Sequence, residues 1–269
     1  MLIINELKER LEQLVKSEDG NWAIVVEDLD KQDSLSINGK HQYYAASIIK
    51  LPIMATAFSM ADQGLLCLSE KIKLKKVDVV GGAGVLQHLS IGLELTFYDL
   101  LMLMIIQSDN TATNMVIDRL GKKQIQATMS QIGMLHSSFY NKLMTVPVQL
   151  EGRNMITAHD VSTFYRTVVE GKFSSQYACE QMIDLLKRQQ IQHLTAYFPD
   201  IPIKHIGQQP EWTFASKTGS VENLYHDTGV LYKRDRTVII NVLSEGCNQN
   251  KAIRMINQIG KEVYEYVKV

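Results

Sequence analysis

Segments typical of β-strands lie at both ends of this 269-residue chain, and segments typical of helices fill the middle. Residues 22–30 and 33–38 carry strand-forming and small apolar residues on either side of a turn around 29–32, which predicts two neighbouring strands. Two strands are marginal alone and need partners. The partners that we expect lie near the other end of the chain, at residues 212–218, 228–233 and 236–243.

This order of segments predicts an α/β fold in which an antiparallel sheet is flanked by N- and C-terminal helices and interrupted by an inserted all-helical lobe. Leucines at helical spacing among charged residues predict an amphipathic helix over residues 1–18, and a second helix is expected over 250–267. We therefore expect a discontinuous α/β lobe made of residues 1–45 and 200–269. Residues 46–199 would form the helical lobe, with a functional site between the two.

Two helices are expected near the middle of the chain. Thr96 is a suitable N-cap for a helix that runs through Ile106 and is apolar nearly all round, as a buried helix should be. A second helix from about residue 111 to residue 120 would end at Gly121. The polar triplet Ser108-Asp109-Asn110 separates them. By itself the triplet would be interpreted as a helix cap.

The stretch from residue 43 to residue 54 is apolar except at a hydroxyl and an amine, Ser47 and Lys50. We expect a helix that starts near Ala46 and runs past Met54, although Pro52 removes one backbone hydrogen bond from it. Residues three apart share a helix face, so Ser47 and Lys50 would lie side by side. Apolar surroundings lower a lysine pKa, and a neutral amine can accept the hydroxyl proton. Alone, such a pair is more often solvent-exposed and without function.

A third polar motif, Lys217-Thr218-Gly219, stands where a strand is expected to end, with Ser220 after it. Ser47-x-x-Lys50, Ser108-Asp109-Asn110 and Lys217-Thr218-Gly219 follow the order known from class A β-lactamases and penicillin-binding proteins. From Trp22 to the C-terminal helix the chain resembles the penicillin-recognising serine hydrolases, and class A β-lactamases most closely. The resemblance implies a β-lactamase-like fold with the active site between the two lobes.

The resemblance also implies an acylation mechanism. Ser47 would attack a strained lactam or an amide carbonyl while Lys50 accepts its proton. The backbone N–H groups of Ser47 and Ser220 would form the oxyanion hole. Ser108 would then protonate the departing nitrogen, leaving an acyl-enzyme.

The remaining motif residues would bind the substrate or support the site. By the same resemblance, Asn110 would bind a substrate amide and Lys217 would anchor a substrate carboxylate. Thr218 or Ser220 would add a hydroxyl contact, and Gly219 would let the ligand approach the backbone closely. Asp109 is expected to brace its loop.

Release of the acyl group is where the chain departs from the family. Class A β-lactamases activate the deacylating water with a glutamate in a Glu-x-x-x-Asn pattern between the second and third motifs. Residues 141–158 contain one glutamate, Glu151, and Asn154 follows it by three residues instead of four. Glu151 is the candidate base, but an exposed loop carboxylate is the more ordinary interpretation. We expect impaired deacylation.

Three function classes remain open from the sequence. The first is a class A-like β-lactamase, favoured by the three motifs. The second is a D-amino-acid peptidase or esterase that uses the same acylation residues, and the third is a β-lactam-binding or peptidoglycan-fragment-binding protein that is acylated without turnover. The altered deacylation segment favours the second, and for the third, acylation without turnover would suffice. All three act on a small-molecule or peptide substrate.

The composition argues against nucleic acid, metal ions and cofactors as ligands. A net charge of −1 argues against nucleic acid as a ligand. Seven scattered histidines and three widely spaced cysteines, Cys67, Cys179 and Cys247, show no metal-ligand spacing, so we expect no metal, no cofactor and free buried thiols. No heptad pattern is present, and a monomer is expected.

The N-terminal segment is too charged for a signal peptide, and no apolar run is long enough for a membrane span. As written, the chain is expected in the cytoplasm. If a leader had been trimmed, the same sequence would belong to an exported protein.

Overall fold

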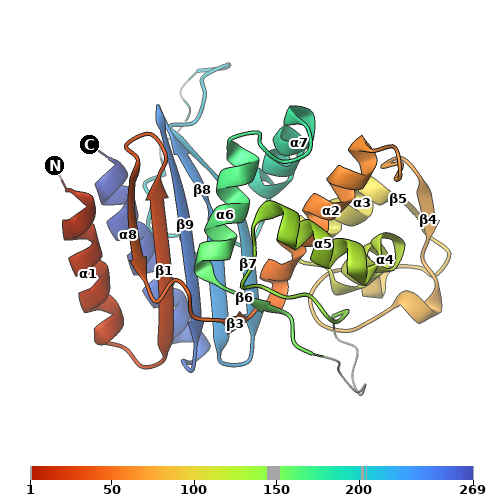
Figure 1. Cartoon of the computed structure of the whole chain (residues 1–269), viewed down its shortest axis with the longest axis horizontal. Coiled ribbons are helices and arrows are strands. Elements are labelled where there is room, and N and C mark those ends of the chain that lie inside the picture. The colour runs from red at the N-terminus through yellow and green to blue at the C-terminus, as the bar shows by residue number, and fades with distance from the viewer. Residues whose placement is uncertain (1, 144–151, 201–202, 204, 269) are drawn as a thin grey trace.

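The computed structural model describes residues 2–143, 152–200, 203 and 205–268. A five-stranded antiparallel sheet runs through its centre in the order β2-β1-β9-β8-β7 (Figure 1). The strands from the two chain ends pair directly, with Val25 of β1 opposite Asn241 of β9. The predicted sheet is therefore confirmed. Its strands are β1 (Asn21–Asp28), β2 (Asp33–Ile37), β7 (Trp212–Val221), β8 (Leu224–Lys233) and β9 (Arg236–Glu245).

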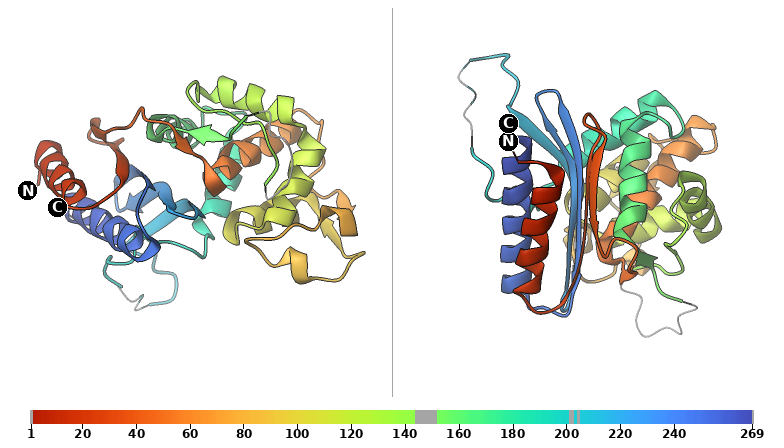
Figure 2. Two further views of the ribbon diagram at one scale, coloured as in Figure 1. Left: turned by 90° about the horizontal axis from the view of Figure 1, so that it is seen from below. Right: turned by 60° about the vertical axis from the view of Figure 1, so that its left-hand side comes forward.

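Helices cover both faces of this sheet. The terminal helices α1 (Ile4–Lys16) and α8 (Gln249–Val267) lie side by side on one face, and the rest of the helices lie on the other (Figure 2). Strand β1 is buried on both sides. Ala23 and Val25 contribute to the core under the helical part, whereas Ile24 and Val26 contribute to the core under α1 and α8. This alternation follows from the two-residue period of a strand.

The segment between the terminal strands is mainly helical, as predicted, and also contains short strands. A two-residue strand β3 pairs with β6, and β4 pairs with β5. Whether residues 46–199 form a lobe of their own remains a prediction. The elements are β3 (Tyr43–Tyr44), η1 (Ala46–Ile49), α2 (Lys50–Asp62), β4 (Lys71–Lys73), η2 (Lys76–Asp78), η3 (Leu86–His88), β5 (Glu94–Thr96), α3 (Phe97–Ile106), α4 (Asn110–Leu120), α5 (Lys122–Ile132), β6 (Met155–Ile156), α6 (Ala158–Val169) and α7 (Gln176–Lys187).

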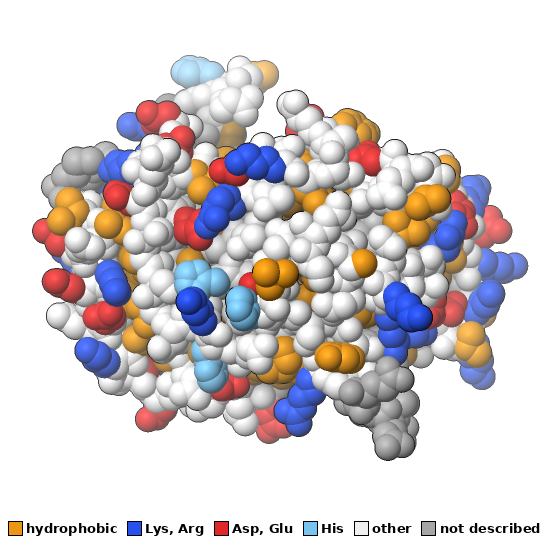
Figure 3. All heavy atoms as spheres, in the orientation of Figure 1, with side chains coloured by type: hydrophobic (Ala, Val, Ile, Leu, Met, Phe, Trp, Pro, Cys, Tyr) orange, Lys and Arg blue, Asp and Glu red, His pale blue; other side chains and the backbone are white. Residues whose placement is uncertain are grey.

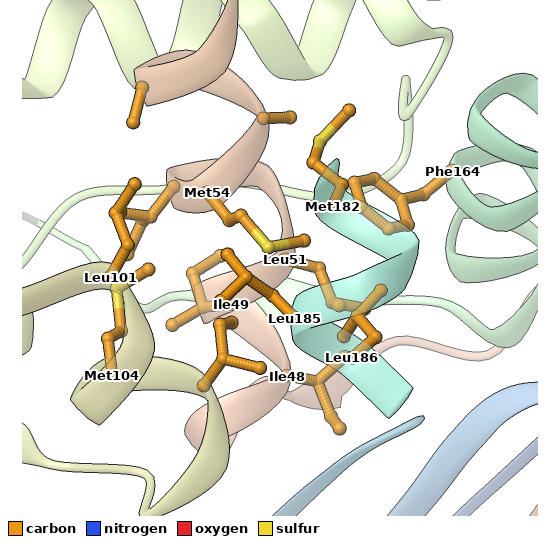
Figure 4. Packing of buried hydrophobic residues seen from close by; sticks show 14 of the residues in the cluster. Ile48, Ile49, Leu51, Met54, Leu101, Met104, Phe164, Met182, Leu185 and Leu186 are labelled. Carbon is orange, nitrogen blue, oxygen red and sulfur yellow. The ribbon is translucent and has the colours of Figure 1, made fainter. Parts of the chain in front are cut away.

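Helix α2 and the end of η1 lie inside the larger of the two apolar cores. Ile49, Leu51 and Met54 are fully buried, and they pack among side chains of α3 and α7 such as Leu101 and Leu185 (Figure 4). Burying aliphatic side chains of this size contributes about 1.5–3 kcal/mol each relative to exposure. The first residues of the predicted helix form the 3₁₀ helix η1, and Pro52 stands in the first turn of α2, where its missing N–H is tolerated.

Helix α3 begins, and helix α4 ends, where the sequence predicts. The Thr96 hydroxyl accepts a hydrogen bond from Asp99 N at 3.1 Å, and the Asp99 carboxylate accepts one from Thr96 N, which makes a capping box. Gly121 closes α4 with φ of 83°.

Two details differ from the sequence-based expectation. Strand β8 begins at Leu224 instead of residue 228. The sequence prediction began too late because His226, Asp227 and Thr228 are polar and interrupt the apolar alternation expected of a strand. Cys67 is exposed, so the expectation of buried thiols is wrong for it and correct for Cys179 and Cys247. The described part of the chain contains no helix long and apolar enough to cross a membrane.

Candidate active site

Ser47 and Lys50 meet at the junction of η1 and α2. Lys50 Nζ lies 3.1 Å from Ser47 Oγ, and Lys50 is completely buried whereas Ser47 is partly exposed. Ala46, directly before Ser47, has a φ of 43°, which is uncommon for a residue with a side chain. Such strain is typical of functional turns. The predicted side-by-side arrangement is therefore present, with the serine facing solvent and the lysine behind it.

The Lys50 amine has four oxygen neighbours. Two of them only accept hydrogen bonds: the Ser108 carbonyl oxygen at 2.6 Å and Asn110 Oδ1 at 3.0 Å. The other two are hydroxyls, Ser47 Oγ at 3.1 Å and Ser108 Oγ at 3.0 Å. A neutral amine has two N–H donors and one lone pair. If the donors serve the carbonyl and the amide oxygen, the lone pair is free to accept a hydroxyl proton.

The surroundings of Lys50 favour that neutral form. Burial lowers the pKa of Lys50 well below its ordinary value, and the nearby charge of Lys217 lowers it further. The carboxylate of Asp109 acts in the opposite direction but does not reverse the shift. The arrangement can therefore supply a general base for Ser47.

Ser108 lies at the bend between α3 and α4. Its φ is 54°, again in the left-handed region, and its backbone turns both the hydroxyl and the carbonyl towards Lys50. Asp109 braces this bend, as predicted. One carboxylate oxygen accepts a hydrogen bond from Ala112 N at 2.9 Å and caps α4, and the other accepts one from Leu86 N at 2.7 Å.

Lys217 reaches the same hydroxyl from the sheet. Its Nζ lies 3.1 Å from Ser108 Oγ and 2.9 Å from the Thr218 carbonyl oxygen. Lys217 is completely buried, and burial lowers its pKa to about 7, although the carboxylate of Asp227 acts to raise it. Ser108 is thus contacted by two lysine amines, one from each side of the site.

Strand β7 is one of the two edge strands of the sheet, and it lies beside η1. Gly219 packs closely against η1, because a Cβ added there would stand 3.0 Å from the backbone nitrogen of Ser47. Of the following residues, Thr218 is nearly buried and Ser220 is exposed. The structure therefore brings together all the predicted motif residues: Ser47, Lys50, Ser108, Asn110, Lys217, Thr218, Gly219 and Ser220.

Asn110 is committed to the site architecture. Its Oδ1 accepts a hydrogen bond from Lys50, its Nδ2 donates to the Gly81 carbonyl at 3.3 Å, and its backbone N–H donates to the Ala83 carbonyl at 3.0 Å. The side chain is 7% exposed. Asn110 therefore holds Lys50 and the 81–84 segment together, in addition to any contact with a ligand.

The segment expected to supply the deacylating base is only partly described. Glu151 lies outside the described residues. Asn154 is buried and anchors the C-terminal side of the segment, because its Oδ1 accepts hydrogen bonds from Tyr140 N and Asn141 N. Its backbone carbonyl accepts a hydrogen bond from Ala45 N at 2.8 Å, two residues before Ser47.

Two buried polar residues near the site were not predicted. His226 and Asp227 lie in β8, opposite Gly219 and Thr218 of β7. Asp227 Oδ2 accepts hydrogen bonds from His193 N and Leu194 N, and burial raises the pKa of Asp227 to about 7. A polar run that breaks the apolar alternation of a central strand was the available sequence signal.

No cluster of metal-ligating side chains was found among the described residues. On the face shown in Figure 3, acidic and basic side chains are interspersed. The site itself is built from buried lysines and hydroxyls, a set suited to proton transfer.

The antiparallel sheet and its covering helices form a β-lactamase-like fold, and the serine–lysine site lies where β7 meets η1. Residues 6–267 match the β-lactamase enzyme family, and the chain belongs to that family. It is a serine hydrolase of the class A β-lactamase-like type. No curated protein sequence matched the chain.

Solved structures support the same fold. A β-lactamase from Sphaerobacter thermophilus DSM 20745 is 27% identical, with a TM-score of 0.90 over 99% of this chain and 98% of that chain. The structure of PBP-A is 24% identical, with a TM-score of 0.86 over 98% and 97%. An ancestral class A β-lactamase is 22% identical, with a TM-score of 0.84 over 97% and 99%.

Proposed function

We propose that this protein reacts with β-lactams through an acyl-enzyme on Ser47 and releases the acyl group slowly. The observation that carries the proposal is the position of Lys50 Nζ, 3.1 Å from Ser47 Oγ and 3.0 Å from Ser108 Oγ. One buried amine can then take the proton from the nucleophile and return it towards the leaving group. A PBP-A variant has been solved as an acyl-enzyme complex with penicillin G, which supports this reaction for the shared fold.

In the proposed acylation step, Ser47 Oγ forms a bond to the lactam carbonyl carbon while its proton passes to Lys50 Nζ. The backbone N–H groups of Ser47 and Ser220 receive the negative charge on the carbonyl oxygen. The carbon–nitrogen bond then breaks, and Ser108 gives its hydroxyl proton to the nitrogen. The proton on Lys50 passes to Ser108, which leaves a neutral Lys50 and an ester on Ser47.

Substrate binding is assigned to the third motif. Lys217 is a completely buried lysine of the edge strand β7, and a substrate carboxylate there would be paired with it and with the hydroxyl of Thr218 or Ser220. Asn110 would contact the substrate amide while it keeps its bond to Lys50. Gly219 leaves room for the ligand against the strand.

Slow deacylation is proposed because the segment of residues 141–158 lacks the Glu-x-x-x-Asn pattern. Asn154 is used by its own loop, since Oδ1 accepts two backbone hydrogen bonds and Nδ2 donates to the Asn141 carbonyl. Its side chain is therefore less available to hold a water. Glu151 remains the candidate base.

The experiment that tests the proposal compares three probes on one preparation: penicillin G, an ester of a D-amino-acid peptide, and a simple carboxylate-free ester. Intact-protein mass and product formation are followed together. A Ser47 adduct with penicillin G and slow product formation supports the proposal. Rapid turnover of either ester with no penicillin adduct would show instead a peptidase or esterase, and an adduct without any product a binding protein.

A further inference from the structure

His226 is buried in β8 and contacts the start of the turn formed by residues 44–47, which we call the nucleophile turn. It is 1% exposed, and its ring packs edge-on against Tyr43 at 5.9 Å between ring centres. Its position in β8 is opposite Gly219, where an added Cβ would stand 3.0 Å from the backbone nitrogen of Ser47. His226 therefore links β8, an inner strand of the sheet, to β3, the short strand that precedes Ser47.

Both ring nitrogens have partners of fixed character. The backbone N–H of Ser244 donates to Nδ1 at 3.2 Å, so Nδ1 carries no proton. Nε2 lies 3.0 Å from the Tyr44 carbonyl oxygen, which only accepts hydrogen bonds, so Nε2 carries the proton and donates it. The ring is therefore the neutral Nε2–H tautomer. Burial favours the same form, because it lowers the pKa of His226 to about 4.

The Tyr44 carbonyl is one of several backbone contacts around the start of the nucleophile turn, where β3 also pairs with β6. The next residue, Ala45, donates its N–H to the Asn154 carbonyl at 2.8 Å, and its carbonyl accepts a hydrogen bond from Ile48 N at 3.0 Å. Ala46 then takes its left-handed conformation, and Ser47 follows. Without the Nε2–H bond, the end of β3 at Tyr44 would lose its hydrogen bond to β8 of the central sheet.

We propose that His226 is a positioning residue for acylation, whose Nε2–H bond to the Tyr44 carbonyl holds the turn that presents Ser47 to Lys50. This inference rests on the proposed function, since it concerns the same nucleophile. Displacement of a reacting group by about 1 Å can cost on the order of a hundredfold in rate. The Ser47–Lys50 contact of 3.1 Å leaves little room for such movement.

Two substitutions separate positioning from general stability. In His226→Gln, the side-chain amide can reach the position of Nε2 and keep a donor for Tyr44, but the acceptor for Ser244 is lost. In His226→Asn, the amide oxygen can replace Nδ1 as acceptor for Ser244, but the donor to Tyr44 is lost. Each variant gives up one buried hydrogen bond, so a purely structural role would affect both alike.

The readout is the rate at which a fluorophosphonate labels Ser47, which needs the nucleophile but no β-lactam recognition. Thermal unfolding of each variant is measured alongside. We expect His226→Asn to label at least about tenfold more slowly than wild type at similar thermal stability to His226→Gln, and His226→Gln to stay within about threefold. Equal rates in the two variants, or a wild-type rate in His226→Asn, would overturn the inference.

The same labelling experiment keeps the two proposals apart. A wild-type protein that reacts with fluorophosphonate but not with penicillin G fails the proposed function and leaves the His226 comparison valid. A wild-type protein that reacts with neither probe overturns both.

Discussion

Lys50 Nζ lies 3.1 Å from Ser47 Oγ, and the lysine is completely buried while the serine is open to solvent. This relationship combines two requirements for an activated serine. A nearby acceptor must have a depressed pKa, and the nucleophile must be reachable by a substrate. The predictions below test this pair, the groups around it and the fold that holds it.

The first prediction concerns the nucleophile. Ser47→Ala should abolish labelling by penicillin G and by a fluorophosphonate, because the attacking oxygen is removed. The fold should be retained, since Ser47 is partly exposed and contributes little to the core. Intact-protein mass and a thermal unfolding curve test both points. Labelling that survives in a folded Ser47→Ala protein would show that another residue is the nucleophile.

The second prediction concerns the base. Lys50→Arg keeps a positive charge that cannot be given up at any working pH. Acylation should slow by at least about a hundredfold, the lower end for general-base catalysis. Stopped-flow acylation kinetics with penicillin G measure the effect. Wild-type kinetics in Lys50→Arg would assign the base to a different group.

The third prediction concerns pH. The pKa of Lys217 is lowered to about 7, so its amine is charged below that pH and neutral above it. The kcat/KM for penicillin G should therefore fall as the pH rises above about 7, because the substrate carboxylate loses its cation. Lys217→Arg stays charged and should not show this fall. The carboxylate-free ester is the matched substrate control, and an equal fall with that ester would contradict the assignment of Lys217.

How far the site could be predicted depended on the kind of residue. Ser47, Lys50, Ser108 and Lys217 lie in three short motifs whose order carried the information, and the structure brings them within hydrogen-bond reach. The sheet was predictable because β1 and β9, which lie near opposite ends of the chain, consist largely of apolar residues. His226 and Asp227 were missed because the polar run that contains them lies just before the predicted strand, and their partners, backbone groups of Tyr44, Leu194 and Ser244, leave no further mark in the sequence.

The fourth prediction concerns the support of the Ser108 bend. Gly84 has a φ of 104°, and a Cβ added there would stand 2.3 Å from the Cα of Asp109. Gly84→Ala should displace Asp109 and slow acylation by at least about tenfold, in line with the cost of small misplacements. Gly64→Ala is the control, because Gly64 also has a positive φ of 71° but nothing lies within 4 Å of the added Cβ.

The Gly64→Ala control should show only the backbone cost, about 1–2 kcal/mol of unfolding free energy, with wild-type acylation. Chemical denaturation and fluorophosphonate labelling measure the two quantities. If Gly84→Ala behaves like Gly64→Ala in both, the close packing of Gly84 on Asp109 does not support the site.

The fifth prediction concerns deacylation. A burst of about one product per enzyme should precede a slow steady rate, the kinetic mark of an accumulating acyl-enzyme. Glu151→Gln tests the candidate base: the steady rate falls and the burst stays if Glu151 activates the water, and neither changes if it does not. Turnover without a burst at about 10 per second or faster would show an efficient deacylating base.

The central claim is tested most directly by intact-protein mass spectrometry during reaction with penicillin G, followed by peptide mapping. The account predicts one added penicillin per protein, located on Ser47, that forms within the burst and decays slowly. The Ser47→Ala protein, treated in the same way, should stay at its original mass. An unmodified wild-type protein, or an adduct on a residue other than Ser47, would contradict the account.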